Sequence, residues 1–159
     1  MSDDTLDTFW KLVKDVHTCM MTTRDGNHLR ARPMAPLFDE TTHEIRFLTQ
    51  LSSHKTDELA SNPDCNLAFA NPSKGDYVSV SGQAYLTQDR KLIDLLWKDD
   101  FKAWFKNGKD DPDVGVIRVV PAQAEYWDSN GALKQAWEVF KAKHSDTQPD
   151  MGENKKLSP

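Results

Sequence analysis

The spacing of hydrophobic and polar positions changes along this chain, and it predicts short strands interleaved with amphipathic helices. Residues 3–17 place apolar side chains at helical spacing, with Asp and Lys between them. Residues 77–86 alternate with a period of two, as a half-buried strand does. The run at 44–50 predicts another strand, and it leads into a short helix at 54–61 that ends at an Asn-Pro pair.

Turn residues separate the remaining apolar runs, which predict further strands. These strands are expected at residues 18–24, 28–38, 66–70, 114–120 and 122–127. Pro33 and Pro36 lie within one of them. Because proline cannot donate to a sheet ladder, that strand is expected to be an edge strand or irregular. Pro121 is expected to separate the last two strands.

The rest of the chain predicts helices and a polar end. Helices are expected from Asp89 to about Trp97, around the aromatic residues at 101–105, and at 132–143, with the aromatic side chains packed as core or as a lid. Residues 1–144 then form one domain, and the polar residues 145–159 are predicted to be a disordered tail. About seven strands with short connections favour a mainly β fold, an antiparallel sheet that curls into a barrel with peripheral helices.

Composition narrows the classes of protein that fit. The chain has 159 residues, enough for one domain with a core, and a net charge of −5, which argues against nucleic-acid binding through clustered positive charge. It contains no apolar run long enough to span a membrane, and its acidic start lacks the features of a secretory signal. We expect a cytoplasmic protein with no membrane partner. Cys19 and Cys65 lie in apolar runs and are expected to be buried, reduced thiols.

Ser53, His54 and Lys55 open the predicted helix directly after a strand. Backbone N–H groups are unpaired at a helix start, and both the helix dipole and the ammonium favour a phosphate there. A capped surface helix with a solvated lysine is the alternative. Arg30 and Arg32 share one strand face by their spacing, and they could hold an anion or pair with acidic residues. The histidines and cysteines show no metal-ligand spacing, so no metal site is predicted.

Four segments together carry a family resemblance. They are Arg-Ala-Arg-Pro-Met at 30–34, residues 47–55, residues 77–82 and residues 124–128. In order and spacing they resemble the FMN-binding split barrel of the pyridoxamine 5'-phosphate oxidase-like family, and more narrowly its bacterial general stress protein subgroup. The resemblance implies an antiparallel split barrel of six to seven strands. It also implies a homodimer with two FMN sites at the subunit interface.

The resemblance also assigns cofactor-binding positions. It implies that Arg32, Pro33 and Met34 lie beside the flavin ring, partly through main-chain groups. Thr49 and the helix opening formed by Ser53, His54 and Lys55 match the positions that hold the ribityl chain and the phosphate. Trp127 matches a tryptophan that packs near the ring.

Two departures from the oxidase itself limit what the resemblance implies. His54 stands where the oxidase has an arginine, so phosphate binding is expected to be weaker or pH-dependent. The segment after Trp127 lacks the basic residues that hold the oxidase's substrate. We therefore expect flavin binding without efficient oxidation of pyridoxamine 5'-phosphate.

Three functions remain open at this point. The first is a flavin-dependent oxidoreductase that passes electrons from a nicotinamide to a small acceptor. The second is a non-catalytic flavin-binding or flavin-sensing stress protein, and the third is a heme or deazaflavin binder on the same barrel. No catalytic acid–base pair stands out in the sequence, but this does not exclude the first function, because a flavin carries the redox chemistry itself.

Overall fold

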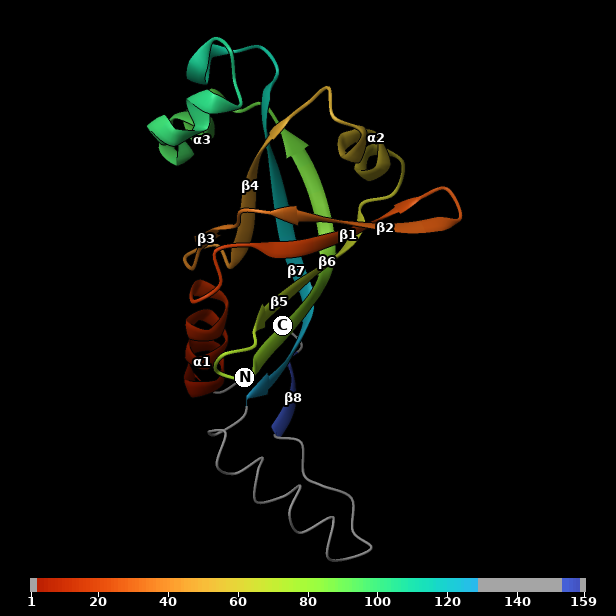
Figure 1. Ribbon diagram of the computed structural model, residues 1–159, viewed down its shortest axis with the longest axis vertical. Helices are drawn as coiled ribbons and strands as arrows, with labels where there is room; N and C mark the ends of the chain where they lie inside the picture. The colour runs from red at the N-terminus through yellow and green to blue at the C-terminus, as the bar shows by residue number, and fades with distance from the viewer. Residues whose placement is uncertain (1–2, 129–152, 158–159) are drawn as a thin grey trace, which may run out of the picture.

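Figure 1 shows a long antiparallel sheet with helices packed at its two ends; this computed structural model describes residues 3–128 and 153–157. The helices are α1 (Asp3–Lys14), α2 (His54–Ser61), α3 (Arg90–Leu96) and the short 3-10 helices η1 (Asp99–Ala103) and η2 (Gly108–Asp110). The strands are β1 (Cys19–Asp25), β2 (His28–Met34), β3 (Leu37–Asp39), β4 (Glu44–Gln50), β5 (Asp64–Asn71), β6 (Asp76–Thr87), β7 (Val114–Asp128) and β8 (Glu153–Leu157).

All the strand pairs in this sheet are antiparallel, and the order is β2-β1-β5-β6-β7-β4-β3, with β8 added to β7. The fold is therefore the mainly β, split-barrel-like architecture that the sequence predicts. As expected for its proline content, β2 is an edge strand. Residues 35–36 are not in a strand and separate β2 from β3.

One predicted boundary is wrong. Residues 114–128 form a single strand, β7, and not two strands separated at Pro121. The β6–β7 register shifts between Ser81 and Gly82, opposite Pro121, and such a bulge accommodates a residue that has no N–H to donate. A Cβ at Gly82 would lie 2.2 Å from the carbonyl oxygen of Val120, so the close approach of the two strands requires glycine there.

The predicted disorder of the tail is also wrong for one segment. Glu153–Leu157 forms β8 and pairs with β7 over Ala124 to Asp128. The free edge of β7 offers backbone donors and acceptors there, and β8 satisfies them. The rest of the predicted tail and the predicted helix at 132–143 lie outside the described residues.

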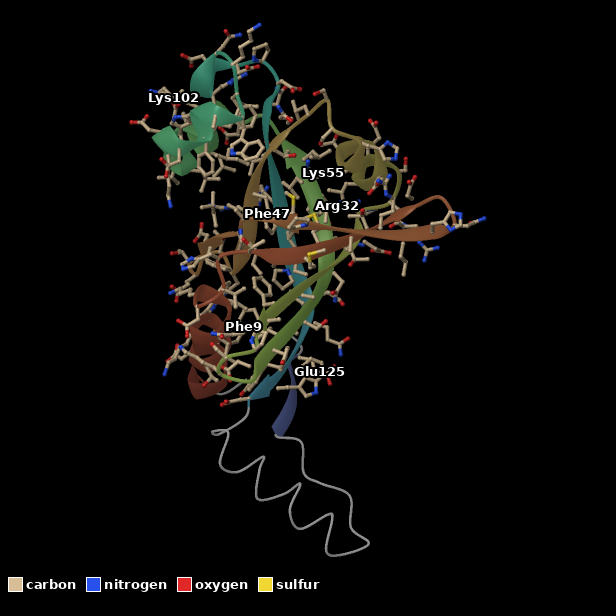
Figure 2. All side chains as sticks on the ribbon, in the orientation of Figure 1. Phe9, Arg32, Phe47, Lys55, Lys102 and Glu125 are labelled. Carbon is tan, nitrogen blue, oxygen red and sulfur yellow. The ribbon has the colours of Figure 1, made fainter. Side chains whose placement is uncertain are left out.

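The main core lies between the sheet and α1. Phe9, Trp10 and Val13 of α1 are buried in one cluster with strand residues, and the ring of Trp10 packs on that of Phe38 with centroids 6.2 Å apart. Phe47 belongs to the same cluster; Figure 2 shows Phe9 beside α1 and Phe47 higher in the view. Cys19 and Cys65 are buried free thiols, as predicted, and burial raises their pKa values to about 12 and about 11. Within the described part of the chain, no helix combines the length and apolar character needed to cross a bilayer.

A second, smaller core supports α3 and the 3-10 helices. Ile93 and Phe105 are buried there against the start of β7, and the ring of Trp97 packs on Phe105 with centroids 5.8 Å apart. Of the two roles predicted for the aromatic side chains, core packing is wrong for Trp104, which is 71% exposed, and the lid role stays a prediction. Its carbonyl oxygen accepts a hydrogen bond from the side chain of Gln50 at 2.9 Å, which ties this unit to the end of β4.

Candidate functional site

The turn between β4 and α2 is held in place by hydrogen bonds from both sides. The hydroxyl of Ser53 donates to the carbonyl of Gln50 at 2.6 Å, and the hydroxyl of Thr56 reaches back to the carbonyl of Ser53 at 2.6 Å. On the other side, the backbone N–H and the hydroxyl of Ser52 donate to the carboxylate of Asp113 at 2.8 and 2.7 Å. The start of α2 is therefore a fixed platform.

Lys55 projects from this platform without an acidic partner. Its ammonium donates to the hydroxyl of Ser53 at 3.0 Å, and among the described residues no carboxylate lies within ion-pair distance of it. Burial, followed by the positive charge of Arg32, lowers the pKa of the Lys55 ammonium, while the carboxylate of Glu58 acts in the opposite direction. A half-buried cation that faces another cation is an arrangement that an added anion would stabilise.

Arg30 and Arg32 reach the same region from β2. In the β1–β2 register they lie opposite Thr23 and Met21, which are both buried, so the two arginines share the face that α2 covers (Figure 1). Their shared face was predicted. Of the two roles left open, the structure places both side chains in ion pairs with acids: Arg32 contacts Glu58 at 2.6 Å, and Arg30 lies 3.2 Å from Asp25 and 3.6 Å from Glu58.

Glu58 is the buried centre of this cluster. One of its carboxylate oxygens accepts hydrogen bonds from the Thr23 hydroxyl and from the Arg32 guanidinium. Burial opposes ionisation of this carboxyl, yet the hydrogen bonds from Thr23 and Arg32 hold its pKa below the usual value. Sequence reasoning missed Glu58, Thr23 and Asp25.

His54 faces the acids of the cluster. Its Nε2 atom lies 3.3 Å from Asp25 and 3.5 Å from Glu58, and the hydrogen bond from His54, followed by that from Arg30, lowers the pKa of Asp25. Ligand atoms of Asp25, His54 and Glu58 lie within 4.8 Å of one another, a donor set suited to a cation that the sequence prediction did not include. Part of this donor set was visible in the sequence, because His54 and Glu58 are four residues apart and so share one face of the predicted helix. However, two guanidinium groups already pair with these carboxylates, and their charge opposes a bound cation.

The structure brings Arg32 and Lys55 near each other, in the upper half of Figure 2, and Ser53 and His54 directly precede Lys55 in the chain. Thr49, at the end of β4, is buried, and its hydroxyl donates to the carbonyl of Gln50. Pro33 and Met34 follow Arg32 on β2. Pro33 is exposed, and Met34 packs partly against the main core.

Trp127 is the exception, because it lies at the far end of the sheet. Thr49 pairs with Gly115 near the start of β7, whereas Trp127 lies near the end of β7, opposite Tyr77. Trp127 lies twelve residues after Gly115 on β7, which corresponds to about 40 Å along a strand. Figure 2 likewise places Lys55 in the upper half and Glu125, two residues before Trp127, at the lower end of the sheet. One chain therefore does not bring Trp127 to the other predicted site residues.

Comparison with known proteins agrees with this architecture. Residues 4–150 match the family model described as pyridoxamine 5'-phosphate oxidase like, so the chain belongs to that family. Protein bli-3 of Neurospora crassa is 40% identical over 118 residues, which are 67% of this chain and 56% of that protein. The chain thus spans only a little over half the length of this relative.

Two solved structures resemble this fold. A candidate general stress protein 26 from Jannaschia sp. CCS1 is 28% identical, with a TM-score of 0.76 over 99% of this chain and 100% of that one. A general stress FMN/FAD binding protein from Xanthomonas citri has a TM-score of 0.73 over 82% of this chain and 93% of that one. At 24% identity, the second likeness is one of fold.

Proposed function

We propose that this chain binds FMN, with the phosphate at the start of α2 between Ser53, His54 and Lys55 and beside Arg32. The observation that carries the proposal is the half-buried ammonium of Lys55, which has no acidic partner among the described residues and is repelled by Arg32. A phosphate dianion would compensate this charge, and the N–H groups at the helix start would add hydrogen bonds. The donor set on the platform therefore fits the group.

The neighbouring predicted residues suit the rest of the cofactor. Thr49 would reach the ribityl chain, and the backbone of Pro33 and Met34 on the edge strand β2 would lie beside the ring. The flavin, when bound, supplies the exchange of electrons between a reduced nicotinamide and a small acceptor. The residues of this chain bind and orient it, and we propose a flavin-dependent oxidoreductase of the general stress type. A cytoplasmic location suits its two buried, unpaired thiols.

We further propose that the site is completed by a second copy of the chain. Trp127 cannot reach a flavin held at Lys55 of the same chain, so Trp127 of the partner subunit would pack near the ring. The outer face of the sheet suits such an interface, because it exposes Met20, Tyr77, Tyr85 and Val120 around small polar side chains. The amide of Asn66 donates to Ser79 and Ser81 at 2.8 and 3.0 Å and so orders the middle of this face.

A flavin titration tests the phosphate assignment. The purified chain should bind FMN much more tightly than riboflavin, which lacks the phosphate. Lys55→Ala should weaken FMN binding by about ten- to a hundredfold, because a charge-assisted contact contributes roughly 1.5–3 kcal/mol, and it should leave riboflavin binding unchanged.

Lys102→Ala is the matched control, because Lys102 is exposed on η1, away from Lys55 in Figure 2. Unchanged FMN affinity in the Lys55 variant would place the phosphate elsewhere. Anaerobic addition of NAD(P)H then separates the two flavin functions, since bleaching of the bound flavin supports an oxidoreductase and a stable yellow colour supports a non-catalytic binder.

A further inference from the structure

Glu58 is a buried acid with one oxygen that lacks a hydrogen bond. Its side chain is only 2% exposed, and Oε2 accepts from Thr23 and Arg32. Oε1 has no hydrogen-bond partner, although Arg30 Nη1 and His54 Nε2 lie 3.6 and 3.5 Å away. Leaving a buried carboxylate oxygen without a hydrogen bond is costly, so the attraction of the surrounding cations must keep it there.

Those cations are the ones that the proposed phosphate site would use. Glu58 lies on α2 three positions after Lys55 and four after His54, with its carboxylate paired to Arg32. The cluster contains three cationic side chains, Arg30, Arg32 and Lys55, and two carboxylates, those of Asp25 and Glu58. Without a ligand, the acids therefore already neutralise most of the charge that would attract a phosphate.

We propose that Glu58 is an internal counter-anion that competes with the ligand's phosphate for Arg32 and so sets how tightly the site holds that phosphate. This inference rests on the proposed function. In the free protein the Glu58 carboxylate holds the Arg32 guanidinium in place and balances its positive charge. When a phosphate is bound, two anions share one set of cations, and their repulsion weakens the complex.

If Glu58 served only to orient Arg32, its substitution would not tighten phosphate binding. Glutamine in this position would still accept a hydrogen bond from Arg32 through its carbonyl oxygen, so the guanidinium would keep its place. What Glu58→Gln removes is the negative charge. If the charge competes with phosphate, binding becomes tighter; if the charge serves to hold Arg32 for the phosphate, binding becomes weaker or stays the same.

The test compares Glu58→Gln with Asp57→Asn by FMN and riboflavin titration. Asp57 is the neighbouring acid on α2; its side chain is 80% exposed and only just reaches His54, at 4.0 Å from Nδ1, so its removal changes the same net charge at the solvent-screened edge of the cluster. We expect Glu58→Gln to bind FMN about tenfold tighter or more, because removing one of two anions that share the Arg32 guanidinium leaves the full attraction of that cation to the phosphate. Riboflavin binding should not change, and Asp57→Asn should match the parent protein. Equal or weaker FMN binding by Glu58→Gln would overturn the proposal.

If Glu58→Gln does not fold, Asp25→Asn provides a second test of the proposal by the same titration. Asp25 pairs with Arg30 and His54 at a partly exposed position, so its removal perturbs the core less. It should also tighten FMN binding, by a smaller factor, and a weaker FMN complex would contradict the counter-anion role.

Inorganic phosphate separates this inference from the proposed function. If the parent protein binds no flavin, the proposed function fails, and phosphate-induced thermal stabilisation then tests Glu58 alone. Glu58→Gln should gain more in Tm from added phosphate than the parent protein and Asp57→Asn do. An equal or smaller gain in Tm would reject the counter-anion role.

Discussion

At the scale of single residues, Glu44 makes it possible for two arginines to lie side by side in the sheet. Arg46 of β4 and Arg118 of β7 face each other across the strands, a like-charge pair that would weaken the ladder. The buried carboxylate of Glu44 accepts hydrogen bonds from Arg46 Nε at 3.0 Å and from Arg118 Nε at 3.1 Å. The hydrogen bond from Arg118 is the largest influence that lowers the pKa of Glu44.

Glu44→Gln should therefore reduce the free energy of unfolding at pH 7 by about 2–3 kcal/mol, because it leaves Arg118 without its counter-charge and Arg46 with Asp39 as its remaining acidic partner. The pKa of Glu44 is lower in the folded chain than in the unfolded one. Its contribution is thus fully present above the unfolded pKa, near the ordinary value of 4.5, and is lost as the pH falls through the folded pKa. Urea denaturation at pH 7 and pH 3.5 should show a smaller loss of stability on acidification for Glu44→Gln than for the parent protein. Equal losses would show that this carboxylate does not contribute to the acid sensitivity.

Sequence reasoning located part of the site at this scale and missed part of it. The basic residues His54 and Lys55 were predictable because a strand leading into a helix start is a local pattern. Glu58, Thr23 and Asp25 were not, because their contacts depend on the β1–β2 hairpin folding under α2. A buried ion pair between segments far apart in sequence leaves no signal in the spacing of either one.

At the scale of elements, the bulge opposite Pro121 determines how β6 and β7 can stay paired over their full length. Gly82→Ala should destabilise the fold by about 1–3 kcal/mol, because the new methyl group meets the backbone of Val120, which cannot rotate away as a side chain can. Gln83→Ala, a change at an exposed neighbour on the same strand, should stay within about 0.5 kcal/mol of the parent protein. Thermal unfolding measures both, and equal effects of the two substitutions would contradict the steric explanation.

The strand and helix pattern was predictable where local signals agree. The bounds of β4 and α2 match the prediction because alternation, a helix start and an Asn-Pro stop all coincide there. The continuity of β7 was missed because a proline within an apolar run predicts the end of a strand. The bulge that accommodates Pro121 involves the partner strand β6, so it cannot be predicted from the sequence of β7 alone. The strand β8 was missed because its sequence, Glu-Asn-Lys-Lys-Leu, has no apolar alternation, and its pairing depends on the edge of β7.

At the scale of the whole molecule, the separation of Lys55 from Trp127 leads us to predict a dimer in solution. Light scattering should give the mass of two chains at micromolar concentration. Ser79→Arg should shift the mass toward one chain, because it places a long charged side chain in the middle of the outer sheet face. The same variant should lose FMN affinity while keeping its circular dichroism spectrum.

Ser73→Arg is the matched control for this prediction. Ser73 lies in the exposed turn between β5 and β6, so the same change there should leave both mass and affinity as in the parent protein. A parent protein that is monomeric and still binds FMN would contradict the two-chain site.

The length of β7 has a genetic consequence. In the proposed dimer each flavin site takes Lys55 from one chain and Trp127 from the other. A substitution of either residue in one chain therefore impairs only one of the two sites. A mixed pair, with one copy lacking Lys55 and the other lacking Trp127, collects both defects in one site and leaves the second site complete. Two alleles that are each inactive should therefore restore one of the two sites in every mixed dimer when they are expressed together, although neither encodes an intact protein.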